Sequence, residues 1–213
     1  MDFSAQYQQT PVPEGGNLIK RNWFPTYEAP PSPAPGDRTI VSWDTALSAR
    51  ELSSYSACVV LQVRGESVYV LDVFRDRLEY PELKRKVLEF HRRWKGYTNN
   101  YALLIENLGS GMSLIQDLRQ EHIHAVGIRP KEEKAIRMNA QTARIEAGSV
   151  HLPRRAQWLD DFFHEVLAFP VSRHTDQIDA LSQALNYAFN RSRTDFVMPG
   201  LAGKTFVGGV QVY

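Results

Sequence analysis

The run Thr39-Ile40-Val41-Ser42-Trp43-Asp44 decides the fold, because it is an apolar segment that ends in a carboxylate. β-Branched and aromatic residues favour a strand, and neither glycine nor proline interrupts the run. A carboxylate on an otherwise buried strand is costly unless it is paired or binds a metal ion. Asp44 is therefore the first candidate for a functional residue.

The segments that follow this run alternate in a pattern typical of a mixed sheet. Gly65-Glu66 marks a hairpin turn between the next two β-rich runs, and helical spacing begins at Pro81. The five expected strands are Thr39–Thr45, Tyr55–Val63, Ser67–Phe74, Tyr101–Glu106 and Ala125–Ile128. Three antiparallel strands followed by alternating helix and strand are the plan of a ribonuclease H-like sheet. We predict an α/β fold with a mixed five-stranded sheet, its first three strands antiparallel, flanked by helices.

The ends of the chain differ from its centre. Prolines crowd the run Ala29-Pro30-Pro31-Ser32-Pro33-Ala34-Pro35-Gly36, which favours an extended segment. We therefore predict an arm and linker over residues 1–37, a ribonuclease H-like domain over 38–190 and a flexible tail over 191–213. Within the domain, the later helices are expected at Lys134–Glu146, around Trp158 to Leu167 and at Asp176–Phe189, with a hairpin around Gly148.

Three carboxylates lie where this fold would bring them together. Asp44 and Glu106 end the first and fourth strands, which are neighbours at the centre of such a sheet, and Asp176 opens the last helix. Asp179 lies one turn further along the same helix face. Hard divalent cations such as Mg²⁺ and Mn²⁺ prefer oxygen ligands, and two such ions can clamp a scissile phosphate. The pattern predicts a two-ion site that cleaves phosphodiesters.

Each acid also has an ordinary structural explanation. Asp176 is a natural residue for a helix start, and Glu106 could simply end a strand at the surface. Asp44 fits a structural role least well, because no turn residue precedes it. Asp72, within Val70-Leu71-Asp72-Val73-Phe74, is a rival strand carboxylate that we interpret as structural.

Basic residues are clustered although the formal net charge is only +1. Such clusters can contact a phosphate backbone through charge alone, but a solvated helix face would look the same. The residues predicted to bind DNA are Lys84, Arg85, Lys131, Lys134 and Arg137.

Composition and motif spacing exclude several other classes. With 43% hydrophobic residues the chain can bury a core, yet no stretch approaches the roughly 20 apolar residues of a membrane span. The N-terminus lacks a signal-peptide pattern, and the lone Cys58 is expected to be a buried core thiol. Gly203-Lys204-Thr205 lacks the first glycine of a phosphate-binding loop, so we expect no ATPase site. His164-Glu165 lacks the second histidine of a zinc protease.

Several motifs together resemble the C-terminal nuclease domain of tailed-phage, or prophage, terminase large subunits. They are Phe3-Ser4-Ala5-Gln6-Tyr7-Gln8-Gln9, Ser42-Trp43-Asp44-Thr45-Ala46, Tyr80-Pro81-Glu82-Leu83, Ile105-Glu106 with Gly109-Ser110-Gly111, Phe169-Pro170 and Asp176-Gln177-Ile178-Asp179-Ala180-Leu181. The resemblance covers nearly the whole chain up to about Phe189. In that family an N-terminal ATPase domain pumps DNA and the C-terminal domain cuts the concatemer, so the chain resembles the nuclease half alone.

The resemblance implies a metal-dependent endonuclease for double-stranded DNA in the host cytoplasm. It assigns Asp44, Glu106 and Asp176 to two Mg²⁺ or Mn²⁺ ions, with Asp179 close by. His174-Thr175-Asp176 carries one acid where the family often has two, which implies weaker metal binding. The family's partners are the portal protein and the small terminase subunit, with no membrane, and we expect the isolated domain to be monomeric. The alternatives are a resolvase- or transposase-type nuclease, or a DNA-gripping or portal-docking module with weak nuclease activity.

Overall fold

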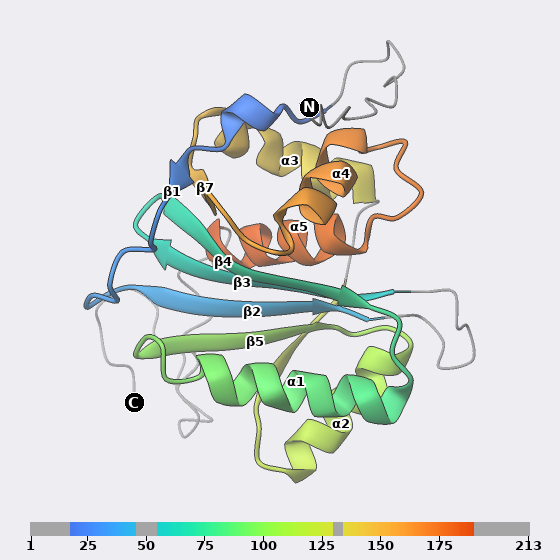
Figure 1. Cartoon of the computed structure of the whole chain (residues 1–213). Helices are drawn as coiled ribbons and strands as arrows, with labels where there is room; N and C mark the ends of the chain where they lie inside the picture. Colours follow the sequence, from blue (N-terminus) through green and yellow to red (C-terminus); the bar gives the residue numbers. More distant parts are fainter. Residues whose placement is uncertain (1–17, 46–54, 130–133, 190–213) are drawn as a thin grey trace, which may run out of the picture.

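A seven-stranded mixed sheet forms the centre of the molecule (Figure 1). The computed structural model describes residues 18–45, 55–129 and 134–189. The strands lie in the order β1-β7-β4-β3-β2-β5-β6. Their bounds are Thr26–Tyr27 (β1), Arg38–Asp44 (β2), Ser56–Arg64 (β3), Ser67–Asp76 (β4), Asn100–Glu106 (β5), Ala125–Ile128 (β6) and Val150–Pro153 (β7).

The five predicted strands are all present, in the predicted arrangement. β2, β3 and β4 pair antiparallel, and β5 pairs parallel with β2 at the centre of the sheet. The predicted count of five strands was too low, because β1 and β7 extend the sheet beyond β4. These strands have only two and four residues, too few for a recognisable alternation of apolar and polar side chains. Gly148 belongs to the turn that joins helix α3 to β7, so the expected hairpin there was wrong.

Helices cover both faces of the sheet (Figure 1). Helices α1 (Tyr80–Trp94) and α2 (Ser110–Gln120) lie on one face, over a core that includes Trp43 and Phe90. Helices α3 (Lys134–Glu146), α4 (Leu159–Ala168) and α5 (Asp176–Phe189) lie on the other, over a core that includes Ile40 and Phe162. Alternate residues of each central strand therefore face the two helical layers.

The N-terminal segment from residue 18 packs against the α3–α5 side of the molecule. Ile19 and Phe24, on either side of the short 3₁₀ turn Arg21–Trp23, are buried in that core. Further on, the Asp37 carboxylate accepts hydrogen bonds from Gln62 and Arg64 of β3. The predicted tail over 191–213 lies outside the described residues.

Two further features are the burial of Cys58 and the length of the helices. Cys58 is fully buried in the core, as predicted, and burial raises the pKa of its thiol well above the ordinary value. In the part of the chain that the structure describes, no helix has the length and apolar character needed to cross a membrane.

Candidate metal-binding carboxylate site

Asp44 and Glu106 end two neighbouring parallel strands. The last paired residues of β2 and β5 are Trp43 and Ile105, and each acid comes one residue later. Ile40 and Leu104 face α5, so Asp44 and Glu106, at even steps along the same strands, face α5 as well. Paired strands are about 4.8 Å apart. The sheet therefore places these two residues on neighbouring strands, on the face that one helix covers.

Helix α5 runs antiparallel to β2 and carries its acidic end toward Asp44. Arg38, at the start of β2, donates to the carbonyl of Ala188 at 2.7 Å, near the end of α5. Gln183 donates to Ser42 Oγ at 3.0 Å and to the Trp43 carbonyl at 3.3 Å. One helical turn back from Gln183 spans about 5.4 Å, and two strand residues forward from Ser42 span about 6.6 Å. Asp179 thus lies level with Asp44, and Asp176 lies almost one turn beyond it.

The Asp179 carboxylate is buried and held by a cation. Its side chain is 4% exposed, and Arg137 Nη2 of α3 donates to Oδ1 at 2.9 Å. Thr175 Oγ1 donates to Oδ2 at 3.2 Å. Arg137 was predicted to contact DNA from a helix face, and in this structure its guanidinium is mostly buried against Asp179.

Glu165 of α4 fixes the N-terminus of α5, and sequence reasoning did not find it. Its carboxylate accepts the backbone N–H groups of Gln177 at 2.7 Å and Ile178 at 3.0 Å, and the Gln177 side chain at 2.7 Å. Arg75 Nη1 of β4 donates to the same carboxylate at 2.8 Å. Glu165 is 1% exposed, and burial raises its pKa. A carboxylate from one helix capping another leaves no local signal in the sequence, because the cap lies eleven residues before α5 begins.

Two glycines bring the start of α2 against the end of β5. Gly109 has a φ of 51°, which favours glycine, and precedes the first helical residue. A Cβ atom at Gly111 would lie 2.0 Å from the Glu106 carbonyl oxygen and 3.0 Å from Thr45 Oγ1. The Thr45 hydroxyl is buried and has no hydrogen-bond partner among the described residues. The turn therefore packs backbone tightly beside both strand-end acids.

The chemical type of these side chains suits a hard divalent cation. Asp44, Glu106, Asp176 and Asp179 offer only carboxylate oxygens, and Asp44 is 8% exposed. However, no three Asp, Glu, His or Cys side chains of the described residues gather closely enough to hold an ion. The fold brings the acids to one end of one helix–sheet layer, and ion binding would require their side chains to converge. A cavity of about 490 Å³, bordered by Arg21, Arg154 and Arg155, includes none of them.

Asp72 lies on the opposite face of the sheet. Its carboxylate pairs with Arg93 of α1 at 3.2 Å, and burial raises its pKa. The interpretation of Asp72 as a structural residue agrees with this position.

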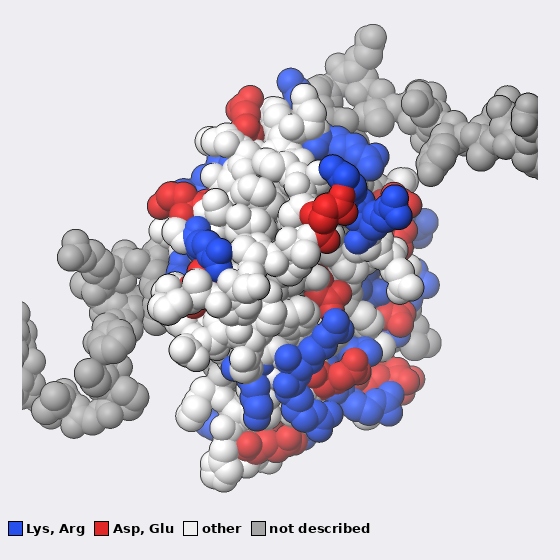
Figure 2. All heavy atoms as spheres, turned by 60° about the vertical axis from the view of Figure 1, so that its left-hand side comes forward, with Lys and Arg blue, Asp and Glu red and all other residues white. Residues whose placement is uncertain are grey.

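The predicted DNA-binding residues occupy different environments. Lys84 pairs with Asp117 of α2 at 3.3 Å and with Glu121, the residue after α2, at 2.8 Å, whereas Arg85 is exposed. Lys131 and the Lys134 side chain lie outside the described residues. On the face of the molecule that Figure 2 shows, basic and acidic side chains lie next to one another, beside a broad area without charge. Pairing of this kind reduces the attraction that each cluster would exert on a polyanion.

The sequence matches a family whose description names this fold. A family model described as the terminase RNaseH-like domain matches residues 41–188. The match covers more than half of the chain, so the chain belongs to this family of RNaseH-like terminase nuclease domains. Among curated proteins, none is similar enough in sequence to count as a match.

Three similar solved structures are viral terminases of low sequence identity. The nuclease of the large terminase from thermophilic phage G20c, with bound zinc, has a TM-score of 0.56 and 16% identity, over 81% of this chain and 94% of that one. The manganese-soaked, inhibitor-bound terminase nuclease domain of human cytomegalovirus has a TM-score of 0.51 and 10% identity, over 70% of this chain and 82% of that one. The large terminase of another thermophilic bacteriophage has a TM-score of 0.58 and 13% identity, over 79% of this chain. This chain spans only 43% of that large terminase.

Proposed function

We propose that the chain is a metal-dependent endonuclease that cuts double-stranded DNA during packaging of a phage genome. The observation that carries the proposal is the placement of Asp44 and Glu106 on adjacent strands beneath the acidic end of α5. Family membership supports nuclease chemistry, and manganese and zinc occur in the similar structures named above. By extension, we propose the portal protein and the small terminase subunit as partners, in the host cytoplasm.

Each acid has a defined part in this proposal. Asp44, Glu106 and Asp176 hold Mg²⁺ or Mn²⁺, and Asp179 supports them from the neighbouring turn. When bound, two such ions make a water molecule more acidic and stabilise the leaving oxygen of the phosphodiester. The buried position of Asp44 keeps its carboxylate in a low-dielectric setting, which strengthens its attraction for a cation. Glu165 keeps the α5 acids in place through its bonds to Gln177 and Ile178.

Plasmid cleavage tests the proposal directly. We expect the chain to nick and linearise supercoiled plasmid with Mn²⁺ or Mg²⁺, and a chelator to abolish both reactions. Asp44→Asn keeps the size of the side chain but removes its charge, so the cutting rate should fall at least about a hundredfold. The melting temperature should also rise less on addition of Mn²⁺ in this variant than in the wild type.

Asp72→Asn is the matched control, because Asp72 is also a strand carboxylate but lies under α1. It should retain cutting and the Mn²⁺-dependent rise in melting temperature. Equal cutting by Asp44→Asn and the wild type would refute the site assignment. A preference for branched over linear duplex would instead support a resolvase-type nuclease.

One observation favours a second candidate, a DNA-gripping module with weak nuclease activity. The Arg137 guanidinium pairs with the Asp179 carboxylate, so it would compete with a metal ion for that carboxylate. Metal-independent duplex binding without any plasmid cleavage would favour this candidate over the enzyme.

A further inference from the structure

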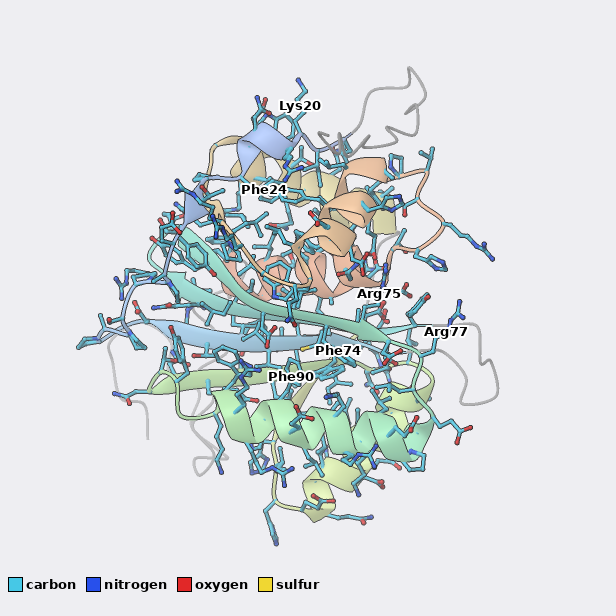
Figure 3. All side chains as sticks on the ribbon, viewed as in Figure 1. Lys20, Phe24, Phe74, Arg75, Arg77 and Phe90 are labelled. Carbon is cyan, nitrogen blue, oxygen red and sulfur yellow. The ribbon has the colours of Figure 1, made fainter. Side chains whose placement is uncertain are left out.

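A group of cationic and aromatic side chains surrounds Tyr55 near the proposed site. The guanidinium carbons of Arg75 and Arg77 lie 4.9 and 4.6 Å from the centre of the Tyr55 ring. The His174 ring meets the same ring edge-on, with centroids 5.0 Å apart. Figure 3 shows Arg75 and Arg77 at the far end of β4, the end at which β2 also finishes. We call these four residues the Tyr55 cluster.

The two arginines of the Tyr55 cluster differ in how their charge is compensated. Arg75 pairs with the buried Glu165 at 2.8 Å and approaches the exposed Asp161 at 3.9 Å. Arg77 is exposed, and no carboxylate of the described residues lies within 4.0 Å of its guanidinium. Two cations against one ring repel each other, so an anion bound at Arg77 would relieve that repulsion.

Strand register places the Tyr55 cluster close to the acids. Asp44 pairs with Ala57, and Ala57 pairs with Arg75, so the three residues form a row across β2, β3 and β4. Ala57 contributes to the core under α5, and Arg75 contacts Glu165 of α4, so this row faces the same helical layer as Asp44. Two strand spacings separate the backbones of Asp44 and Arg75 by about 10 Å. Arg77 lies two residues farther toward the end of the sheet.

We propose that Arg77, stacked on Tyr55, binds a backbone phosphate of duplex DNA two or three nucleotides from the bond that is cut. A DNA strand advances about 3.4 Å per nucleotide along the helix axis, which suits the separation between Arg77 and Asp44. Stacking holds the guanidinium by its face and leaves its N–H groups, which lie in the plane, available for phosphate oxygens. Arg75 binds no DNA in this scheme and positions Tyr55. This inference rests on the proposed function and names a contact that the sequence did not suggest.

Duplex binding in the presence of chelator tests the contact without interference from cutting. We expect Arg77→Gln to raise the Kd for a fluorescent DNA duplex on the order of tenfold. The slope of log Kd against log salt should fall by about one, because one phosphate contact is lost. Arg77→Lys should keep the slope and lose only part of the affinity, since the charge remains but the stacked planar group does not.

Arg119→Gln is the matched control, because it removes another exposed arginine, in the last turn of α2. It should change neither Kd nor slope. Tyr55→Leu should weaken binding as Arg77→Gln does, and the double variant should be little worse than either single one, since both changes remove the same contact. The Mn²⁺-dependent rise in melting temperature should be unchanged in Arg77→Gln.

The outcomes separate this inference from the proposed function. If Arg77→Gln keeps the wild-type Kd and slope while Asp44→Asn abolishes cutting, the phosphate contact is refuted and the nuclease stands. Loss of the Mn²⁺ response in Arg77→Gln would also overturn the inference, because Arg77 would then support the acids rather than DNA.

Discussion

At the scale of single residues, the proposed site depends on a close approach between the backbones of α2 and β5 as well as on the acids. Gly111, the second residue of α2, lies so near Glu106 that any larger side chain must displace the end of β5 or the start of the helix. Gly111→Ala would put its Cβ atom 2.0 Å from a backbone oxygen, which no change of rotamer can relieve. We expect a loss of about 1–3 kcal/mol in the free energy of unfolding, measured in urea, together with slower plasmid cutting.

Gly96→Ala is the control for this prediction. A Cβ atom at Gly96 meets nothing within 4 Å, and the residue follows α1 on the surface. Its free energy of unfolding should stay within about 0.5 kcal/mol of the wild type. If Gly111→Ala behaves like Gly96→Ala, the turn beside Glu106 is not constrained as described.

At the scale of elements, α5 depends on a cap that belongs to α4. Glu165→Gln keeps the shape of the side chain but loses the charge that Arg75 and the α5 amide groups share. In either orientation, the new amide nitrogen would face two donors, either the Arg75 and Gln177 side chains or the backbone N–H groups of Gln177 and Ile178, so hydrogen bonds are lost. We expect a loss of about 2–4 kcal/mol in the free energy of unfolding, with cutting reduced further than folding alone explains.

The control for α5 is Asp161→Asn. Asp161 also approaches Arg75, but its side chain is 80% exposed and the distance is 3.9 Å, so little stability depends on it. The test is to compare thermal unfolding and plasmid cutting between Glu165→Gln and Asp161→Asn. Similar behaviour of the two would mean that Glu165 does not hold the helix that carries Asp176 and Asp179.

The elements were largely predictable because their signals are local. The run that ends at Asp44 is β-branched and apolar, and apolar residues after Pro81 recur at helical spacing; the structure has a strand and a helix there. β1 and β7 were missed because short edge strands owe their existence to pairing with distant residues. The same holds at the site. Asp44 and Glu106 could be placed side by side from strand order, whereas Glu165 and Tyr55 act through contacts that no sequence period encodes.

At the scale of the whole molecule, one carboxylate joins the segment between β1 and β2 to strand β3. Asp37 accepts hydrogen bonds from Arg64 Nη2 at 2.7 Å and from Gln62 at 2.8 Å. The same two side chains donate to the carbonyl oxygens of Ser32 and Pro31. Loss of Asp37 would therefore loosen the path of the chain from Pro31 to β2, along with the pairing at the start of that strand.

The pH dependence of stability follows from this attachment. Hydrogen bonds from Arg64 lower the pKa of Asp37 far below its ordinary value of 3.8, so the folded protein favours the charged form. The stabilisation is complete well above pH 3.8 and is lost as pH falls toward the folded pKa. Asp37→Asn should lower the melting temperature by a few degrees at neutral pH, and the difference from the wild type should shrink in acid. Asp160→Asn, an exposed acid on α4, should show no such trend. A difference for Asp37→Asn that is constant from neutral to acid pH would mean that the charge of Asp37 does not attach the segment.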